Sequence, residues 1–209
     1  MYTHSKETQS SLTPELAFQI LKEGNERFVK NLKANRNLLQ QVNETKEGQF
    51  PFATILSCMD SRTSAELIFD QGLGDIFSIR IAGNILNDDI LGSMEFGTKV
   101  VGTKIILVLG HTKCGAIVGA CNGVELGSLT GLLHKVQPAI VEETSVQENR
   151  NGSNTEFVNK VTMRHVRLTM QAIPARSEII RTLVAEGKVS IVGGVYNVES
   201  GVVDFFEAE

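Results

Sequence analysis

Five consecutive residues, Cys58-Met59-Asp60-Ser61-Arg62, hold a thiol, a carboxylate and a guanidinium. A second cluster holds an imidazole and a thiol, at His111 and Cys114. Two thiols and one imidazole form the ligand set of a catalytic zinc that keeps one coordination position for water. Because His-x-x-Cys is common by chance, an alternative stays open, in which the two cysteines are buried structural thiols and His111 is a core histidine.

The carboxylate of Asp60 lies two residues before the guanidinium of Arg62. At this spacing the guanidinium can bind both carboxylate oxygens in a fork, which keeps the carboxylate ionised and fixes its direction. Beside a zinc-bound hydroxide, Asp60 would accept the hydrogen bond of the hydroxide and aim its lone pair at an electrophile. The alternative is a surface salt bridge that stabilises the protein little.

Both polar clusters directly follow short apolar runs, at residues 51–56 and 105–110. Runs that are apolar on both faces and rich in strand formers predict buried parallel strands. In open α/β sheets, ligands bind at the carboxyl ends of the strands. We therefore expect the two clusters to face one crevice. His165, in a helical context without a partner pattern, is expected at the surface.

The remaining chain alternates helices with further strands, which predicts an α/β fold. We expect a mostly parallel sheet of four strands plus an antiparallel edge strand, flanked by helices. The pattern divides into an N-terminal helical arm, residues 1–34, and a single α/β zinc-binding catalytic domain, residues 35–209. The arm can pack on its own domain or on a partner subunit. The other predicted strands are 76–81, 189–192 and 202–206; the helices are 14–34, 64–70, 90–102, 116–121, 126–143, 156–173 and 174–187; a polar loop is expected at 35–49 and a turn at 193–196.

Composition excludes several classes of protein. The 209 residues carry a formal net charge of −4 and no tract rich in Lys or Arg, so nucleic acid is not an expected partner. The apolar stretches are of strand length, and the polar start is followed by no apolar segment, so we expect neither membrane insertion nor export, and a cytoplasmic protein. Three cysteines cannot form a disulfide framework.

Taken together, the motifs resemble those of the β-class carbonic anhydrases. The resemblance covers nearly the whole chain and keeps the order and the approximate separations of the family's motifs. The residues that carry it are Cys58-Met59-Asp60-Ser61-Arg62, Arg80-Ile81-Ala82-Gly83-Asn84, Gly110-His111-Thr112-Lys113-Cys114-Gly115, and two further landmarks, Gly24-Asn25-Glu26-Arg27-Phe28 and Gly193-Gly194-Val195-Tyr196.

The resemblance implies an enzyme that interconverts carbon dioxide and bicarbonate with one zinc ion per chain. Its ligands would be Cys58, His111 and Cys114, and Asp60 and Arg62 would form the orienting dyad. Two alternatives remain. One is a hydrolase of the same fold that acts on carbon disulfide or carbonyl sulfide, and the other is a non-catalytic zinc-binding protein.

The resemblance also implies a substrate pocket. Gln49 matches a glutamine that hydrogen-bonds substrate at the metal, and Phe77 and Ala82 match the apolar wall around carbon dioxide. Phe96 stands where many members have a Tyr. In this family part of the wall comes from a neighbouring subunit, which implies a homodimer or homotetramer.

A last expectation is that the zinc site is open, with Asp60 on Arg62 and away from the metal. In the bicarbonate-regulated branch of the family, the counterpart of Asp60 can ligate zinc, and a Trp precedes the first ligand Cys by three residues. Ile55 occupies that position here, whereas Arg80 matches an Arg of the regulatory pocket and argues the other way.

Overall fold

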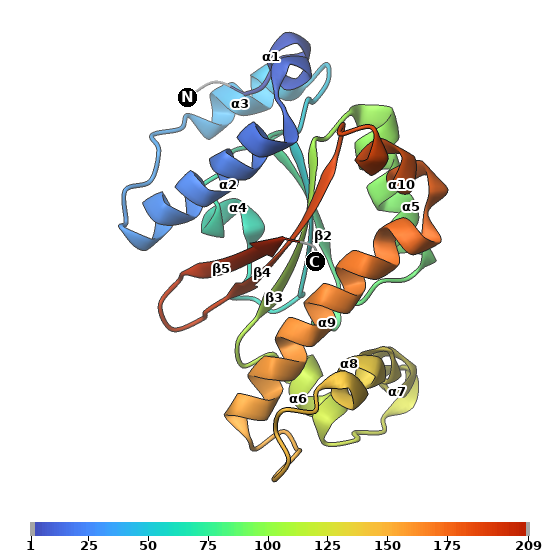
Figure 1. Ribbon diagram of the computed structural model, residues 1–209. Coiled ribbons are helices and arrows are strands. Elements are labelled where there is room, and N and C mark those ends of the chain that lie inside the picture. Colours follow the sequence, from blue (N-terminus) through green and yellow to red (C-terminus); the bar gives the residue numbers. More distant parts are fainter. Residues whose placement is uncertain (1–2, 208–209) are drawn as a thin grey trace.

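The structure is a computed structural model that describes residues 3–207. Residues 1–2 of the predicted arm and residues 208–209 of the predicted domain lie outside this range. Its five strands form one sheet in the order β2-β1-β3-β4-β5 (Figure 1). The first four run parallel, and β5 is antiparallel to β4, as predicted. The strands are β1 (Ala53–Ser57), β2 (Ile76–Arg80), β3 (Ile105–His111), β4 (Ser190–Tyr196) and β5 (Val203–Glu207).

Helices cover both faces of this sheet, as predicted (Figure 1). None of the helices within residues 3–207 is long and apolar enough to cross a bilayer. The helical segments are α1 (Lys6–Ser11), α2 (Pro14–Val29), α3 (Leu38–Thr45), α4 (Ala65–Ile68), η1 (Ala82–Asn84), α5 (Asp88–Glu95), η2 (Phe96–Val101), α6 (Gly115–Cys121), α7 (Gly127–Leu133), η3 (His134–Val136), α8 (Gln137–Glu142), α9 (Thr155–Arg176) and α10 (Glu178–Ala185).

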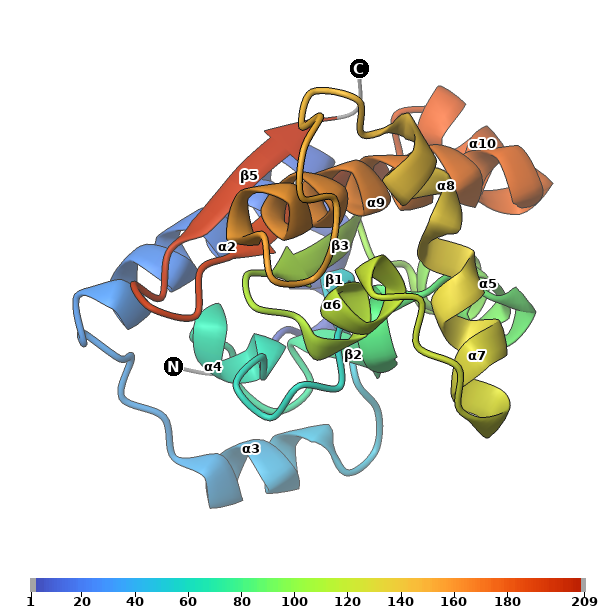
Figure 2. The same ribbon diagram turned by 90° about the horizontal axis from the view of Figure 1, so that it is seen from below.

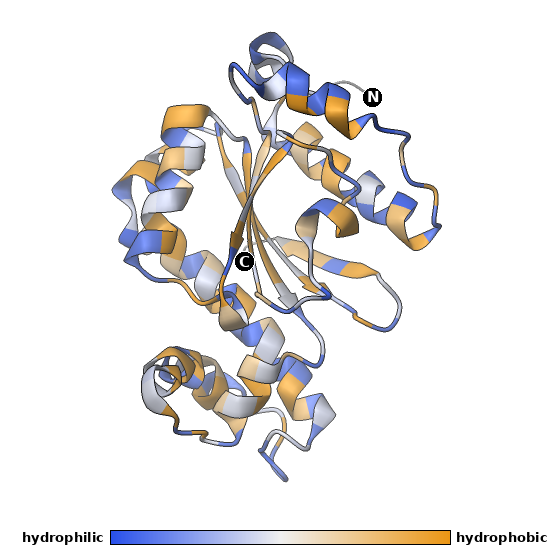
Figure 3. Cartoon of the chain, turned by 180° about the vertical axis from the view of Figure 1, so that it is seen from behind, coloured by the Kyte–Doolittle hydropathy of each residue, from blue (hydrophilic) through white to orange (hydrophobic). Residues whose placement is uncertain are grey.

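The core consists of apolar layers on the two faces of the sheet. On one face, Ile55 and Leu107 pack with residues of α2 and α4, such as Leu21. On the other face, Leu56 and Ile106 pack with residues of α5, α9 and α10. Hydrophobic residues run along the central strands in Figure 3. Because β1 and β3 are buried along their whole lengths, the residues that follow them are held in fixed positions.

The segment Gly24–Phe28 holds α2 against its own domain. A Cβ atom at Gly24 would overlap the carbonyl oxygen of Phe69, so only glycine permits this close approach. The next residue, Asn25, is 5% exposed and hydrogen-bonds the backbone of α4 and of residues 201 and 203. Within one chain, the helix of the predicted arm therefore packs on the sheet, while contact of its outer face with a partner subunit stays a prediction.

The predicted polar loop at 35–49 is wrong, because it contains α3. Asn37 caps this helix by accepting a hydrogen bond from the backbone of Gln40. The helix lies at the periphery of the fold in Figure 2, with Leu39 82% exposed, and its buried residue is the polar Gln41. Apolar periodicity detects helices with a buried apolar stripe, and α3 has none.

Several helix boundaries also differ from the prediction, and the first is the end of α2, which stops at Val29 instead of residue 34. The last helix does not begin at Pro174: α9 runs through this proline to Arg176, and Ser177 caps α10 by accepting from the amide of Ile180. Pro174 lies in the last turn of α9, and the helix ends two residues after it. The helix predicted at 126–143 is interrupted, because η3 separates α7 from α8.

The predicted turn at 193–196 is wrong as well, because these residues belong to β4. A Cβ atom at Gly193 would collide with the side chains of Met170 on α9 and Phe206 on β5. The glycine therefore permits close packing on the sheet, which is the other common role of glycine inside a strand.

Candidate metal centre and active site

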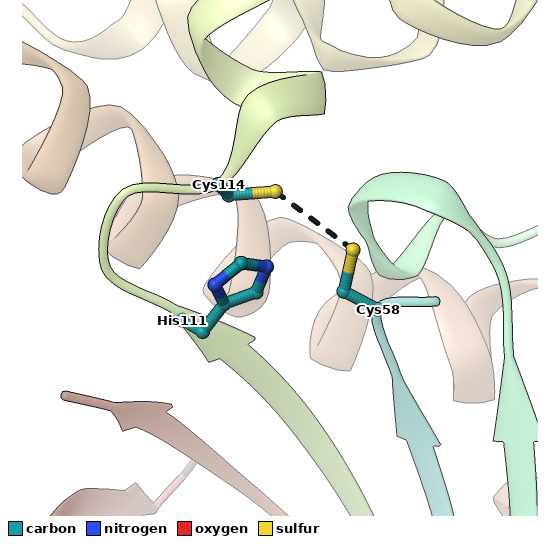
Figure 4. Close-up of side chains that lie close together, drawn as sticks. All are labelled: Cys58, His111 and Cys114. Carbon is teal, nitrogen blue, oxygen red and sulfur yellow. Dashed lines mark hydrogen bonds between the residues drawn. The ribbon is translucent and has the colours of Figure 1, made fainter. Parts of the chain in front are cut away.

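Cys58, His111 and Cys114 meet at the carboxyl end of the sheet, as predicted (Figure 4). Cys58 directly follows β1, His111 is the last residue of β3, and Cys114 directly precedes α6. Because β1 and β3 are parallel neighbours, their carboxyl ends lie side by side. The three potential ligand atoms lie within 4.8 Å of one another, with the two Sγ atoms 3.9 Å apart, and all three residues are buried.

The imidazole of His111 is oriented for a cation. Its Nδ1 lies 2.9 Å from the carbonyl oxygen of Thr112, an acceptor, so Nδ1 carries the proton and Nε2 has a free lone pair. This Nε2 is buried and has no hydrogen-bond partner among the described residues. An unpaired buried acceptor is unfavourable, and a metal ion at this point would satisfy it. The donor set fits zinc.

The two thiols differ in their acidity. The pKa of the Cys58 thiol is lowered, chiefly because Cys114 is hydrogen-bonded to it and stabilises the thiolate, whereas burial acts in the opposite direction. The backbone amide of Gly83 also donates to Cys58 Sγ, at 3.3 Å. The pKa of Cys114 is raised by the same contact, since this thiol holds the shared proton. The pair already has one thiolate available as a ligand.

Asp60 and Arg62 form the fork that their spacing indicates. Arg62 donates from Nε to Oδ1 of Asp60 at 2.9 Å and from Nη2 to Oδ2 at 2.7 Å. These hydrogen bonds hold the pKa of Asp60 well below its usual range, so the carboxylate is ionised at neutral pH. Asp60 Oδ2 lies 4.0 Å from Nε2 of His111. An ionised carboxylate thus lies at the edge of the triad.

Two further side chains hold the loop that carries Cys58 and Asp60. Arg80 donates from Nε to the carbonyl oxygen of Cys58 at 3.1 Å and from Nη2 to that of Asp60 at 2.5 Å. Thr63 donates through Oγ1 to the carbonyl oxygen of Cys58 at 3.0 Å. The sequence left the role of Arg80 ambiguous, and the structure shows a tie between β2 and this loop.

One residue near the site was not found from the sequence. His165, expected at the surface, is only 5% exposed and lies 3.0 Å through Nε2 from the carbonyl oxygen of Gly83. The helical pattern around it carried no signal, because its partner comes from a turn 82 residues away.

Of the four residues predicted to line the substrate pocket, Ala82 lies beside the triad, since the next residue bonds Cys58. The other three lie at the opposite end of the sheet within this chain. Gln49 precedes β1, and Phe77 pairs with Thr54 at the start of β1. Phe96 packs on Phe77 with ring centroids 6.3 Å apart and is 53% exposed. A single chain does not bring these three side chains to its own triad.

Several known proteins are similar to this chain in sequence or in fold. Carbonic anhydrase 2 of Mycobacterium tuberculosis is 37% identical over 196 residues, which cover 90% of each protein. The carbonic anhydrase of Mycolicibacterium smegmatis is 32% identical over 198 residues, covering 91% of this chain and 92% of the relative. The β-carbonic anhydrase CafA of Aspergillus fumigatus has the same fold, with a TM-score of 0.73 at 23% identity over 93% of this chain and 91% of the other.

A tetrameric β-carbonic anhydrase of Sordaria macrospora also shares the fold, with a TM-score of 0.70 at 22% identity over 78% of this chain and 84% of that one. Residues 53–203 match the family model described as carbonic anhydrase, and this segment contains the triad and the dyad. The chain belongs to the β-class carbonic anhydrase family.

Proposed function

We propose that the protein catalyses the zinc-dependent, reversible hydration of carbon dioxide to bicarbonate and a proton. The observation that carries this proposal is the unpaired Nε2 of His111, buried within 4.8 Å of two cysteine sulfurs and next to an ionised Asp60. Membership of the carbonic anhydrase family supports the same reaction.

Cys58, His111 and Cys114 would hold one zinc ion per chain, and the ion would supply a hydroxide nucleophile near neutral pH. Both cysteines would be thiolates in that state, and the backbone amide of Gly83, which donates to Cys58 Sγ, favours the charged form of Cys58. Three protein ligands leave a fourth position open. Since Arg62 already engages both oxygens of Asp60, the carboxylate is directed to its partner and is not needed as a ligand.

Asp60 would orient the nucleophile. An ionised carboxylate can only accept hydrogen bonds, so it selects the orientation in which the nucleophile's proton faces Asp60 and its lone pair faces carbon dioxide. The fork from Arg62 limits rotation of the carboxylate. The proton released in the reaction would pass to the solvent.

We further propose that the substrate pocket is completed by a second copy of the chain. Gln49 lies before β1 and Cys58 directly after it, and the five residues of this strand span roughly 16 Å at about 3.3 Å per residue. Phe96 is exposed and lies beside the edge strand β2. A partner packed on this edge would receive Gln49, Phe77 and Phe96 at its own triad. The tetrameric assembly of the Sordaria macrospora enzyme supports such an oligomer.

The three cysteines of the chain are all free. Free thiols at a metal site persist in a reducing compartment, which supports our proposal of a cytoplasmic location.

Stopped-flow measurement of carbon dioxide hydration, on protein of measured zinc content, tests the reaction. Activity should rise in proportion to zinc occupancy and disappear after chelation. Zinc-loaded protein without hydration activity would contradict the proposal, and carbon disulfide and carbonyl sulfide would then be tested as substrates.

Mixing two inactive variants tests the shared pocket. Cys58→Ser removes a ligand, and Gln49→Ala removes the substrate contact. If Gln49 acts on the partner's triad, a mixed dimer contains one site with an intact triad and an intact glutamine, and activity returns on mixing. If Gln49 acts within its own chain, no mixed site is intact and the mixture stays inactive.

A further inference from the structure

His165 is a buried residue of α9 that contacts Gly83, the residue whose amide bonds Cys58. Its Nε2 lies 3.0 Å from the carbonyl oxygen of Gly83. Because a carbonyl oxygen can only accept, Nε2 is the donor and carries the proton. Burial lowers the pKa of His165 to about 4, so the ring is neutral at physiological pH and this Nε2–H is its only donor.

Gly83 is held from two sides. Its carbonyl oxygen accepts from His165, and its amide donates to Sγ of Cys58 at 3.3 Å. Its φ of 66° lies in the left-handed region, which glycine adopts without strain. A Cβ atom at this position would lie 3.2 Å from Cβ of Ala116. With no side chain of its own to fix it, the glycine depends on these contacts for its position.

We infer that His165 is a positioning residue of the metal centre, which fixes Gly83 so that its amide stays directed at the Cys58 sulfur. An amide hydrogen bond to a thiolate stabilises its charge and fixes the direction of its lone pairs. Partners of this kind, one step removed from the metal, commonly change metal affinity by about 10- to 100-fold when they are lost. This inference rests on the proposed function only in that Cys58 is taken to be a metal ligand.

The alternative is that the His165 ring serves only to fill space in α9. A matched pair of substitutions separates the two, because Gln and Met have similar length and flexibility but only Gln carries an N–H donor. The ring also lines a surface hollow of about 570 Å³, which gives either side chain room. His165→Gln should keep the hydrogen bond to Gly83, and His165→Met should lose it.

The experiment measures zinc affinity by competition with a chelator, and the sulfur-to-cobalt charge-transfer absorption of the cobalt-substituted protein. We expect His165→Met to weaken zinc binding on the order of tenfold and to shift the absorption band, with His165→Gln close to wild type. Equal affinity and equal spectra for both variants and wild type would overturn the inference. An equal loss in both variants would also overturn it, since the ring and not the donor would then matter.

A second measurement covers the case in which His165→Met does not fold. Hydrogen exchange of the Gly83 amide in the wild-type zinc protein should be slow, because the amide is bonded to Cys58 and held in place. Rapid exchange would overturn the inference. None of these readouts depends on catalysis, so a zinc protein that fails to hydrate carbon dioxide would contradict the proposed function and leave this test intact.

Discussion

Replacing Asn25 by Ala should destabilise the protein strongly, although the residue is not part of the triad. The side chain is 5% exposed and forms three hydrogen bonds to backbone groups. It donates to the carbonyl oxygens of Ile68 at 3.2 Å and Gly201 at 2.9 Å, and it accepts from the amide of Val203 at 2.9 Å. It thereby joins α2 to α4 and to the start of β5.

The expected loss follows from the groups that truncation leaves behind. Each hydrogen bond contributes about 1 kcal/mol, and a buried group left without a partner costs roughly 1–3 kcal/mol. For two carbonyl oxygens and one amide, we expect Asn25→Ala to lower the free energy of unfolding by roughly 3–5 kcal/mol. In a chain of this size, that corresponds to a decrease in Tm of about 10 °C.

The assay is urea unfolding of the zinc-loaded protein, at one protein concentration for all variants. Glu26→Ala is the matched control, because it changes the next residue of the same helix to the same side chain. Glu26 pairs with Lys30 at 3.5 Å, and both side chains are more than 60% exposed, so its loss should change stability by about 0.5 kcal/mol at most. An Asn25→Ala variant within about 1 kcal/mol of this control would refute the reasoning.

Three further predictions concern the site. Cys114→Ser should lose most of its zinc and Cys121→Ser, outside the triad, should keep it, as measured by metal analysis; equal occupancy would contradict the ligand assignment. Asp60→Asn should lower kcat by about 10- to 100-fold at unchanged zinc content. The amide keeps the shape of the side chain but loses the charge that pairs with Arg62. A wild-type kcat in stopped flow would exclude an orienting role for Asp60. Burial moves the pKa of His165 from 6.5 to about 4, so between these pH values only the unfolded chain takes up the proton. The free energy of unfolding should therefore fall by roughly 3 kcal/mol in total as the pH drops through this window. In urea unfolding at each pH, His165→Gln should lack this part of the loss.

The chain's sequence alone was enough to predict the parallel sheet and the triad. Apolar runs of strand length mark β1 and β3 locally, and polar side chains directly after such runs must lie at the carboxyl edge of the sheet. The positions of Cys58, His111 and Cys114 follow from this rule. The spacing of Asp60 and Arg62 likewise predicts the two hydrogen bonds between their side chains, because both residues lie on one short loop.

Only the tertiary structure decided the features that depend on residues distant in sequence. The sequence around Gly193 is typical of a turn, but the residue lies in β4. Glycine is needed there because a Cβ atom would collide with side chains of α9 and β5. His165 had no local signal, because its partner Gly83 is brought to it by the packing of α9 on the sheet. Gln49 and Phe77 match the family's pocket in sequence, yet the direction of β1 and β2 places them away from their own triad. Periodicity and spacing report on neighbours along the chain, whereas these positions are set by contacts across it.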